Sequence, residues 1–326
     1  MNFTTYIPSK SKFCREYVAI KRNSLQLPIF ISVVKGIKPV MDDWIEPDKY
    51  LAYKKLCKKY GLYVIPDVIF EFKKIPTDVI GREYLTTTKA YGIPFLKKYT
   101  KRNYNELHVF ISKSKESLIQ AFENGWYPLI IKNRLINKPL IDYYRFGVAL
   151  GFPECCVKFF REFNNWGKYS YLYEAFKNTP KGQYFYLCNP FTKETGYSYI
   201  SYMPCAYNCK NTIEFAKRVK NCIREEEPRL VKEIDERLRL PLLVFYEKKF
   251  YAFKGVIRKG KIYYKDVYFI GGMQENNMYE RDLREGDAVF IENKDVIILK
   301  RGKLIKKIKH NHKDFAPEIP FIISFN

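Results

Sequence analysis

The apolar pattern of the first 137 residues alternates between strand-like and helix-like stretches. PIFISVVKG (28–36) and LYVIPDVIFEF (62–72) are rich in β-branched and aromatic residues, which favours strands. Between them, PDKYLAYKKLCKKYG (47–61) repeats apolar residues at helical spacing and ends on glycine. A predicted strand at LHVFISK (107–113) and a helix at KESLIQAFEN (115–124) follow. We therefore predict a mixed α/β unit for this part of the chain.

Helical spacing dominates residues 138–239. The stretch IDYYRFGVAL runs into Gly151, which suits the left-handed conformation just past a helix end. Pro153 suits the first position of a new helix, because its missing N–H would have no partner there. Further on, NTIEFAKRVKNCIREEEP predicts another helix, with Asn211 in a start that resembles a capping box. This region is expected to be mainly helical.

The last segment, 240–326, changes to the pattern of short strands. Six runs rich in β-branched and aromatic residues follow one another, at 240–247, 249–258, 261–270, 287–293, 295–301 and 303–308. Lys259-Gly260, Asn293-Lys294 and Arg301-Gly302 fall where hairpin turns are expected. We predict a small antiparallel β-barrel with a tail, and an α+β fold for the whole chain.

Length and composition are those of an ordinary globular protein. The 326 residues suffice for about two domains. Hydrophobic residues make up 47% and charged residues 29%, which does not fit a disordered chain. No run approaches the roughly 18 apolar residues of a membrane helix. The N-terminus lacks the apolar stretch of a signal peptide, so we expect a cytoplasmic protein.

A net charge of +23 indicates a polyanionic partner such as RNA, including tRNA. The excess of lysine is spread along the chain, however, which also fits a heat-adapted protein. Two stretches, 97–104 and 300–309, combine cations with aromatic or apolar residues. From them we predict a nucleic-acid-binding set of Lys97, Lys98, Lys101, Arg102, Arg301 and Lys303. The alternative for the second stretch is an edge strand with solvated lysines.

The eight cysteines fall into two groups. Four stand alone, at positions 14, 57, 188 and 222, and are expected to pack in the core. The other four form two pairs, each following a proline at a predicted helix start: Cys155 and Cys156 in GFPECC, and Cys205 and Cys209 in MPCAYNC. Helix N-termini stabilise thiolates, the form that binds metals. Two such helix starts brought together would make a soft-metal site.

Three interpretations of this quartet stay open: a metal site, redox or nucleophilic chemistry, and core packing. Cys156 lies on an apolar helix face with Phe159, Phe160 and Phe163, as a packed cysteine would. Structural zinc usually has a C-x2–4-C clasp on each side, and only the second pair has that spacing. Adjacent cysteines point apart, which favours an iron–sulfur cluster over zinc. Thr212 stands where a radical S-adenosylmethionine motif would have its third cysteine.

The two cysteine motifs together resemble the archaeal family catalogued as domain of unknown function 483. The resemblance covers about residues 145–220. The matching positions are Gly151, Phe152, Pro153, Cys155, Cys156, Phe160, Pro204, Cys205 and Cys209. The family motif has a histidine two residues before the Pro-Cys, where this chain has Tyr202. If that histidine is a ligand in relatives, one contact has changed here. The family has no established activity to carry over.

From these observations we expect a metal-binding, iron–sulfur protein that acts on or binds RNA, in tRNA modification or sulfur chemistry. The alternatives are a non-enzymatic RNA-binding module stabilised by zinc or a cluster, and an interaction protein whose cysteines only pack. Whether the protein is an enzyme stays open. Asp42-Asp43 is predicted to be a loop and Glu225-Glu226-Glu227 a solvated helix end, and neither indicates an acid–base pair.

Overall fold

A computed structural model describes residues 5–73, 84–89, 106–125, 129–131, 134–136, 142–163, 171–246, 249–270, 279–309 and 320–326. The chain forms two compact units, one of Tyr6–Val157 and the other mainly of Lys158–Asn326, and the division falls inside helix α6 (Glu154–Phe163). Both contain helices and strands, which confirms the α+β class. The predicted boundaries at 137/138 and 239/240 stay predictions. No helix in the described stretches is long and apolar enough to cross a membrane.

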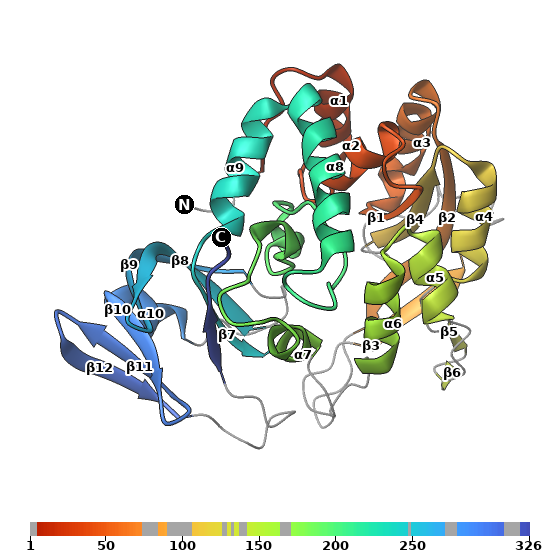
Figure 1. The fold of residues 1–326 in the computed structure, drawn as a ribbon. Helices are drawn as coiled ribbons and strands as arrows, with labels where there is room; N and C mark the ends of the chain where they lie inside the picture. The colour runs from red at the N-terminus through yellow and green to blue at the C-terminus, as the bar shows by residue number, and fades with distance from the viewer. Residues whose placement is uncertain are drawn as a thin grey trace. The chain divides into compact units, whose positions relative to one another are not determined.

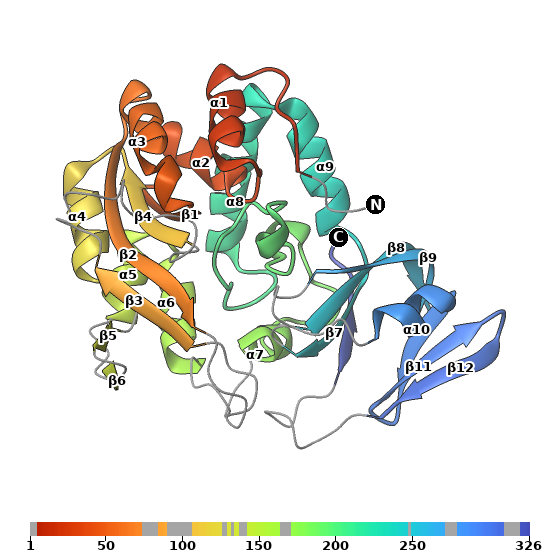
Figure 2. The same ribbon diagram turned by 180° about the vertical axis from the view of Figure 1, so that it is seen from behind.

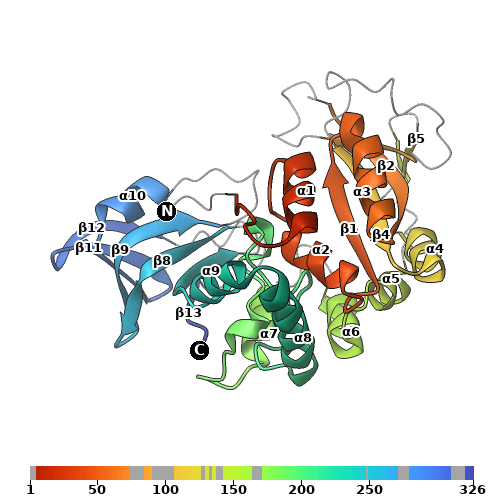
Figure 3. The ribbon, with the colours of Figure 1, turned by 90° about the horizontal axis from the view of Figure 1, so that it is seen from above.

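The N-terminal unit is built on a four-stranded antiparallel sheet with the order β1-β4-β2-β3 (Figure 1). Its strands are β1 (Val40–Ile45), β2 (Tyr63–Lys73), β3 (Tyr84–Lys89) and β4 (Glu106–Ser112), and a separate hairpin pairs β5 (Leu129–Ile131) with β6 (Arg134–Ile136). Its helices are α1 (Lys12–Lys21), α2 (Leu27–Val34), α3 (Tyr50–Lys59), α4 (Lys115–Glu123) and α5 (Tyr143–Ala149). Helix α3 packs on β2 (Figure 3).

Helices cover both faces of this sheet. On one face, Phe110 of β4 packs with Leu118 of α4 and Phe146 of α5. On the other, the Asp43 carboxylate of β1 accepts hydrogen bonds from Tyr17 of α1 and Tyr53 of α3. Strand residues alternate between the two faces, so each helical layer contacts its own set of side chains.

Two predictions for this unit were wrong. The apolar run 28–36 is not a strand but helix α2, whose residues Leu27–Val33 are all buried. An apolar run without alternation cannot distinguish a buried strand from a buried helix, and Pro28 in the first turn favours the helix. The neighbouring strand is β1, and it contains Asp42 and Asp43, which were predicted to lie in a loop. Buried hydrogen-bond partners allow Asp43 to occupy a strand.

The C-terminal unit combines a helical part with a sheet (Figures 1 and 2). Helices α7 (Tyr171–Lys177), α8 (Lys210–Glu226) and α9 (Pro228–Leu238) follow α6, with the short 3-10 helix η3 (Tyr186–Cys188) packed on α8 and α9. The predicted acidic helix end at 225–227 is only partly solvated. Glu227 is buried where α8 ends and α9 begins.

All six strands predicted near the C-terminus are present: β7 (Leu242–Tyr246), β8 (Lys249–Arg258), β9 (Lys261–Phe269), β10 (Ala288–Glu292), β11 (Asp295–Lys300) and β12 (Lys303–Ile308). Helix α10 (Glu280–Glu285) precedes β10, and the strands enclose a core that includes Tyr251, Ile262 and Ile298. The turns at Lys259-Gly260, Asn293-Lys294 and Arg301-Gly302 have positive φ where it is expected.

The predicted barrel is not closed among the described strands. The sheet is open, in the order β12-β11-β10-β9-β8-β7-β13, with β12 and β13 (Phe321–Ile323) at its two edges. The sequence did not indicate β13, which has three residues and pairs with β7 far back along the chain. Exposed lysines along β12 are typical of an open edge that must not pair with another strand.

Candidate metal centre

The start of α6 is fixed by a tight turn after α5. Gly151 has φ +75°, which glycine adopts without strain, and a Cβ at this position would lie 2.4 Å from Pro39 Cδ. The buried Lys38 ammonium donates to the Leu150 carbonyl at the end of α5 and lies 4.4 Å from the centre of the Phe152 ring. The carbonyl of Pro153 then accepts the Cys156 amide at 2.9 Å. Cys155 and Cys156 therefore lie in the first turn of α6.

The second cysteine pair lies in the loop that leads into α8. Cys209 is the N-cap of this helix, which agrees with the start predicted near 209–212 and lies two residues before the capping-box position at Asn211. The buried ring of Tyr207 anchors the loop, because its hydroxyl donates to the Leu172 carbonyl at 2.8 Å and its amide donates to Thr179 Oγ1 at 2.7 Å. Asn178 Nδ2 donates to the Cys205 carbonyl at 3.2 Å. Both cysteines thus belong to a well-anchored segment.

The four sulfur atoms of Cys155, Cys156, Cys205 and Cys209 all lie within 4.8 Å of one another. The sulfurs of the adjacent pair are 3.9 Å apart. Cys156 and Cys209 are buried, whereas Cys155 and Cys205 are partly exposed. These four cysteines, which we call the thiol cluster, are therefore close enough to hold a metal ion.

The thiol cluster has the donor set and spacing of a tetrahedral metal site. Metal–sulfur bonds of about 2.3 Å in a tetrahedron place the sulfurs about 3.8 Å apart. The adjacent pair is at 3.9 Å, and the other separations are within 4.8 Å. Cys155 lies in the first turn of α6 and Cys209 is the N-cap of α8, so both lie at the N-terminal end of a helix. Thiolate ligands are typical of zinc and iron sites in proteins.

The four isolated cysteines are all buried, as predicted for core residues. Cys188 lies nearest to the thiol cluster, with its sulfur 3.7 Å from the Cys209 carbonyl oxygen. Burial raises the pKa of the Cys188 thiol, and the neighbouring Cys209 adds to this effect. Cys188 is therefore a packing neighbour of the thiol cluster rather than one of its four members.

Tyr202 occupies the position at which the resembling family has a histidine. Its ring is buried against Phe215 of α8, with 5.9 Å between ring centres. Its hydroxyl donates to Thr212 Oγ1 at 3.2 Å. In this chain the position thus supports the first turns of α8.

The predicted nucleic-acid-binding residues divide into two groups. Lys97, Lys98, Lys101 and Arg102 lie outside the described residues. Arg301 lies in the turn between β11 and β12, and Lys303 begins β12; both are exposed. Further along β12, Lys307 pairs with Asp295 at 2.9 Å. The turn thus presents two cations, and Arg301 and Lys303 have no ion pair among the described residues.

The sequence did not indicate two clusters of buried ionisable side chains in the N-terminal unit, one around Asp43 and one around His108. Asp43 pairs with Lys21 at 2.6 Å in the interior. On the other face, His108 Nδ1 lies 3.0 Å from Asp67, and Nε2 lies 3.4 Å from the partly exposed Asp42. Burial lowers the pKa of His108, but the hydrogen bonds to the two carboxylates outweigh it and raise the pKa above 6.5. These partners come from distant parts of the chain.

Comparisons with protein-family models, with curated proteins and with solved structures found no match to this chain. The resemblance to the family catalogued as domain of unknown function 483 therefore rests on the cysteine motifs alone.

Proposed function

We propose that this protein binds one metal ion through the thiol cluster and uses the outer face of its C-terminal sheet to bind single-stranded RNA. The spacing of the four sulfurs supports the metal-binding half. From the two cysteine motifs we also propose that this chain belongs to the family catalogued as domain of unknown function 483.

A single tetrahedral ion, zinc or iron, fits the thiol cluster better than a four-iron cluster. In a four-iron cluster each cysteine binds a different iron, so the ligand sulfurs stand further apart than around one ion. Separations within 4.8 Å are those of one shared ion. This reverses the preference for iron–sulfur that the adjacent cysteines suggested in the sequence.

Metal analysis of protein purified without chelators and without oxygen tests this half of the proposal. We expect one equivalent of zinc or iron and no acid-labile sulfide. Cys156→Ala is expected to lose the metal, whereas Cys57→Ala, which removes a buried cysteine of the N-terminal unit, keeps it. Iron with matching sulfide would show a cluster instead. Metal-free wild-type protein would show that the four cysteines pack without an ion.

RNA binding is supported by one face of the C-terminal sheet. The outer face of this hairpin presents Val256 and Arg258 of β8 and Lys261, Tyr263 and Lys265 of β9. These residues alternate with partly buried residues in β8 and mostly with buried residues in β9. Val256 and Tyr263 are cross-strand partners that are 50% and 45% exposed. An exposed aromatic ring among cations is the arrangement on which unpaired bases stack while lysines and arginines contact phosphates.

Fluorescence anisotropy with a labelled single-stranded RNA tests this half. We expect binding that weakens steeply between low and high salt, because phosphate contacts release counterions. Tyr263→Ser is expected to weaken binding about tenfold, the effect of losing one stacked base. Lys265→Glu should weaken it too, whereas Lys115→Glu on α4 should weaken it less, although the charge change is the same. Absence of binding at low salt contradicts the proposal.

A further inference from the structure

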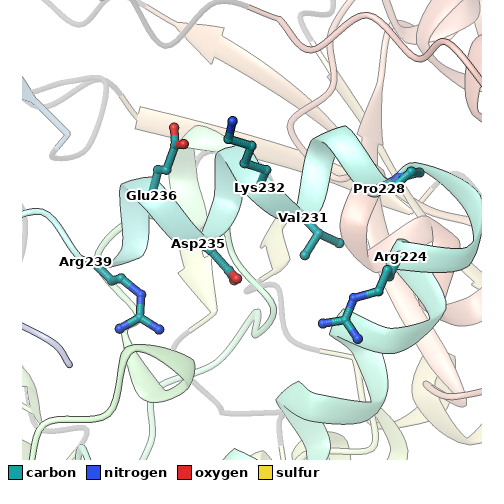
Figure 4. Close-up of a pocket in the computed structure, with 7 residues that line it drawn as sticks. All are labelled: Arg224, Pro228, Val231, Lys232, Asp235, Glu236 and Arg239. Atoms are coloured by element: carbon teal, nitrogen blue, oxygen red, sulfur yellow. The ribbon is translucent and has the colours of Figure 1, made fainter.

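A hollow of about 450 Å³ lies along helix α9 and the end of α8 (Figure 4). It is lined by Arg224, Pro228, Val231, Lys232, Asp235, Glu236 and Arg239. Its volume is in the range of sites for small ligands. All of these residues belong to the C-terminal unit, and none belongs to the thiol cluster or to the RNA-binding face of the sheet.

The two arginines of the hollow contact neighbouring side chains. The Arg239 guanidinium lies over the Tyr186 ring, 3.7 Å from its centre. Arg224 Nη1 donates to Asn221 Oδ1 at 3.1 Å. An arginine stacked on an aromatic ring keeps its N–H groups available at the edge for a planar or tetrahedral anion. The Arg239 side chain is therefore oriented before any ligand arrives, whereas Arg224 has, within the described residues, a single exposed hydrogen bond to Asn221.

Of the two acidic residues in the hollow, Asp235 lies between the arginines (Figure 4), but its carboxylate already has other partners. Asp235 Oδ1 accepts a hydrogen bond from the Tyr199 hydroxyl at 2.7 Å, and Oδ2 pairs with the Lys220 ammonium. Glu236 projects away from the side on which the two arginines lie (Figure 4). Within the part of the chain that the structure describes, neither Arg224 nor Arg239 has a carboxylate partner. The hollow thus carries a local excess of positive charge.

We propose that this hollow binds a phosphate group, with Arg224 and Arg239 as its two contacts. Charge-assisted bonds from arginine to phosphate are among the strongest hydrogen bonds in proteins. The two arginines enter the hollow from opposite ends of α9, because Arg224 lies near Pro228, the first residue of the helix, and Arg239 is its C-cap (Figure 4). The phosphate belongs either to a free nucleotide or to the end of an RNA strand.

Calorimetric titration with adenosine 5′-monophosphate and with adenosine tests the proposal. We expect the monophosphate to bind and adenosine not to bind. Arg224→Gln and Arg239→Gln should each weaken binding about tenfold or more, because each removes a charge-assisted contact. Arg239→Lys, which keeps the charge but loses the stacked fork, should also weaken it. Arg229→Gln is the matched control, since this exposed residue of α9 does not line the hollow.

Titration with short RNAs that carry a 5′-phosphate or a 5′-hydroxyl identifies the source of the phosphate. Tighter binding of the 5′-phosphate RNA than of the 5′-hydroxyl RNA assigns the hollow to an RNA end. Equal binding of the two RNAs, together with binding of the monophosphate, assigns it to free nucleotides. No binding of any phosphate, or equal weakening by Arg229→Gln, overturns the proposal. Because Tyr263→Ser leaves this site intact, failure of the RNA-binding face and failure of the hollow are told apart.

Discussion

Lys38 shows how one buried residue connects the N-terminal sheet to the cysteine-bearing helix. Its side chain contacts the Leu150 carbonyl and the Phe152 ring, both just before α6. Burial lowers the pKa of Lys38 from 10.5 to about 7, although the nearby Asp42 carboxylate opposes the shift. Folding therefore tends to remove the proton that the unfolded chain keeps.

This shift predicts a defined pH dependence of stability. Below pH 7 both states carry the proton, and the folded state bears the full cost of burying the charge. From about pH 7 to 10.5 the unfolded state binds more protons, so the free energy of unfolding rises with pH. Lys38→Met removes this contribution. We expect urea unfolding at several pH values to show a smaller rise in the free energy of unfolding for Lys38→Met than for the wild type.

The control for this measurement is Lys54→Met, which replaces an exposed lysine of α3. It should keep the pH dependence of the wild type, because other titrating groups such as His108 are unchanged. If the free energy of unfolding rises equally with pH in Lys38→Met and in the wild type, Lys38 is charged in the folded protein.

At the scale of elements, the turn between α5 and α6 sets where the first two cysteines lie. Gly151 and Gly61 both have positive φ, but a Cβ on Gly61 would meet nothing within 4 Å, whereas one on Gly151 would meet Pro39. Alanine costs about 1 kcal/mol at either position for the backbone conformation. We expect Gly151→Ala to cost about 1–3 kcal/mol more, because it overpacks the turn. Urea unfolding of Gly151→Ala and Gly61→Ala measures the difference. If both variants lose the same free energy of unfolding, Pro39 moves aside at no cost.

Elements whose signals are local were predicted, and elements that depend on distant partners were not. The alternation of apolar residues and the turn residues between them predicted β7 to β12 correctly. The prolines before Cys155 and Cys205 marked the two segments whose cysteines lie close together. The strand at Asp43 depends on hydroxyls from α1 and α3, and β13 depends on β7. The hollow beside Arg239 needs Tyr186 from another segment. No local pattern carries such contacts.

At the scale of the whole molecule, the proposed metal ion would crosslink two segments that lie far apart in the sequence. An ion held by Cys155, Cys156, Cys205 and Cys209 closes a loop of roughly 50 residues, and a covalent link of that length restricts the unfolded chain by about 4 kcal/mol. A metal bound to the folded protein adds its own binding free energy, less any affinity for the unfolded thiols.

Metal removal is therefore expected to lower the melting temperature by several degrees, and one equivalent of zinc should restore it. Calorimetry of the protein before and after treatment with a strong chelator measures the change. Cys209→Ser is the matched control: with one ligand lost, it should melt at the lower temperature and respond little to the chelator. The buried Cys14→Ser variant keeps the thiol cluster and should respond as the wild type does. Identical melting of treated and untreated wild-type protein would show that the four thiols pack without an ion, because a metal bound only to the folded state must stabilise it.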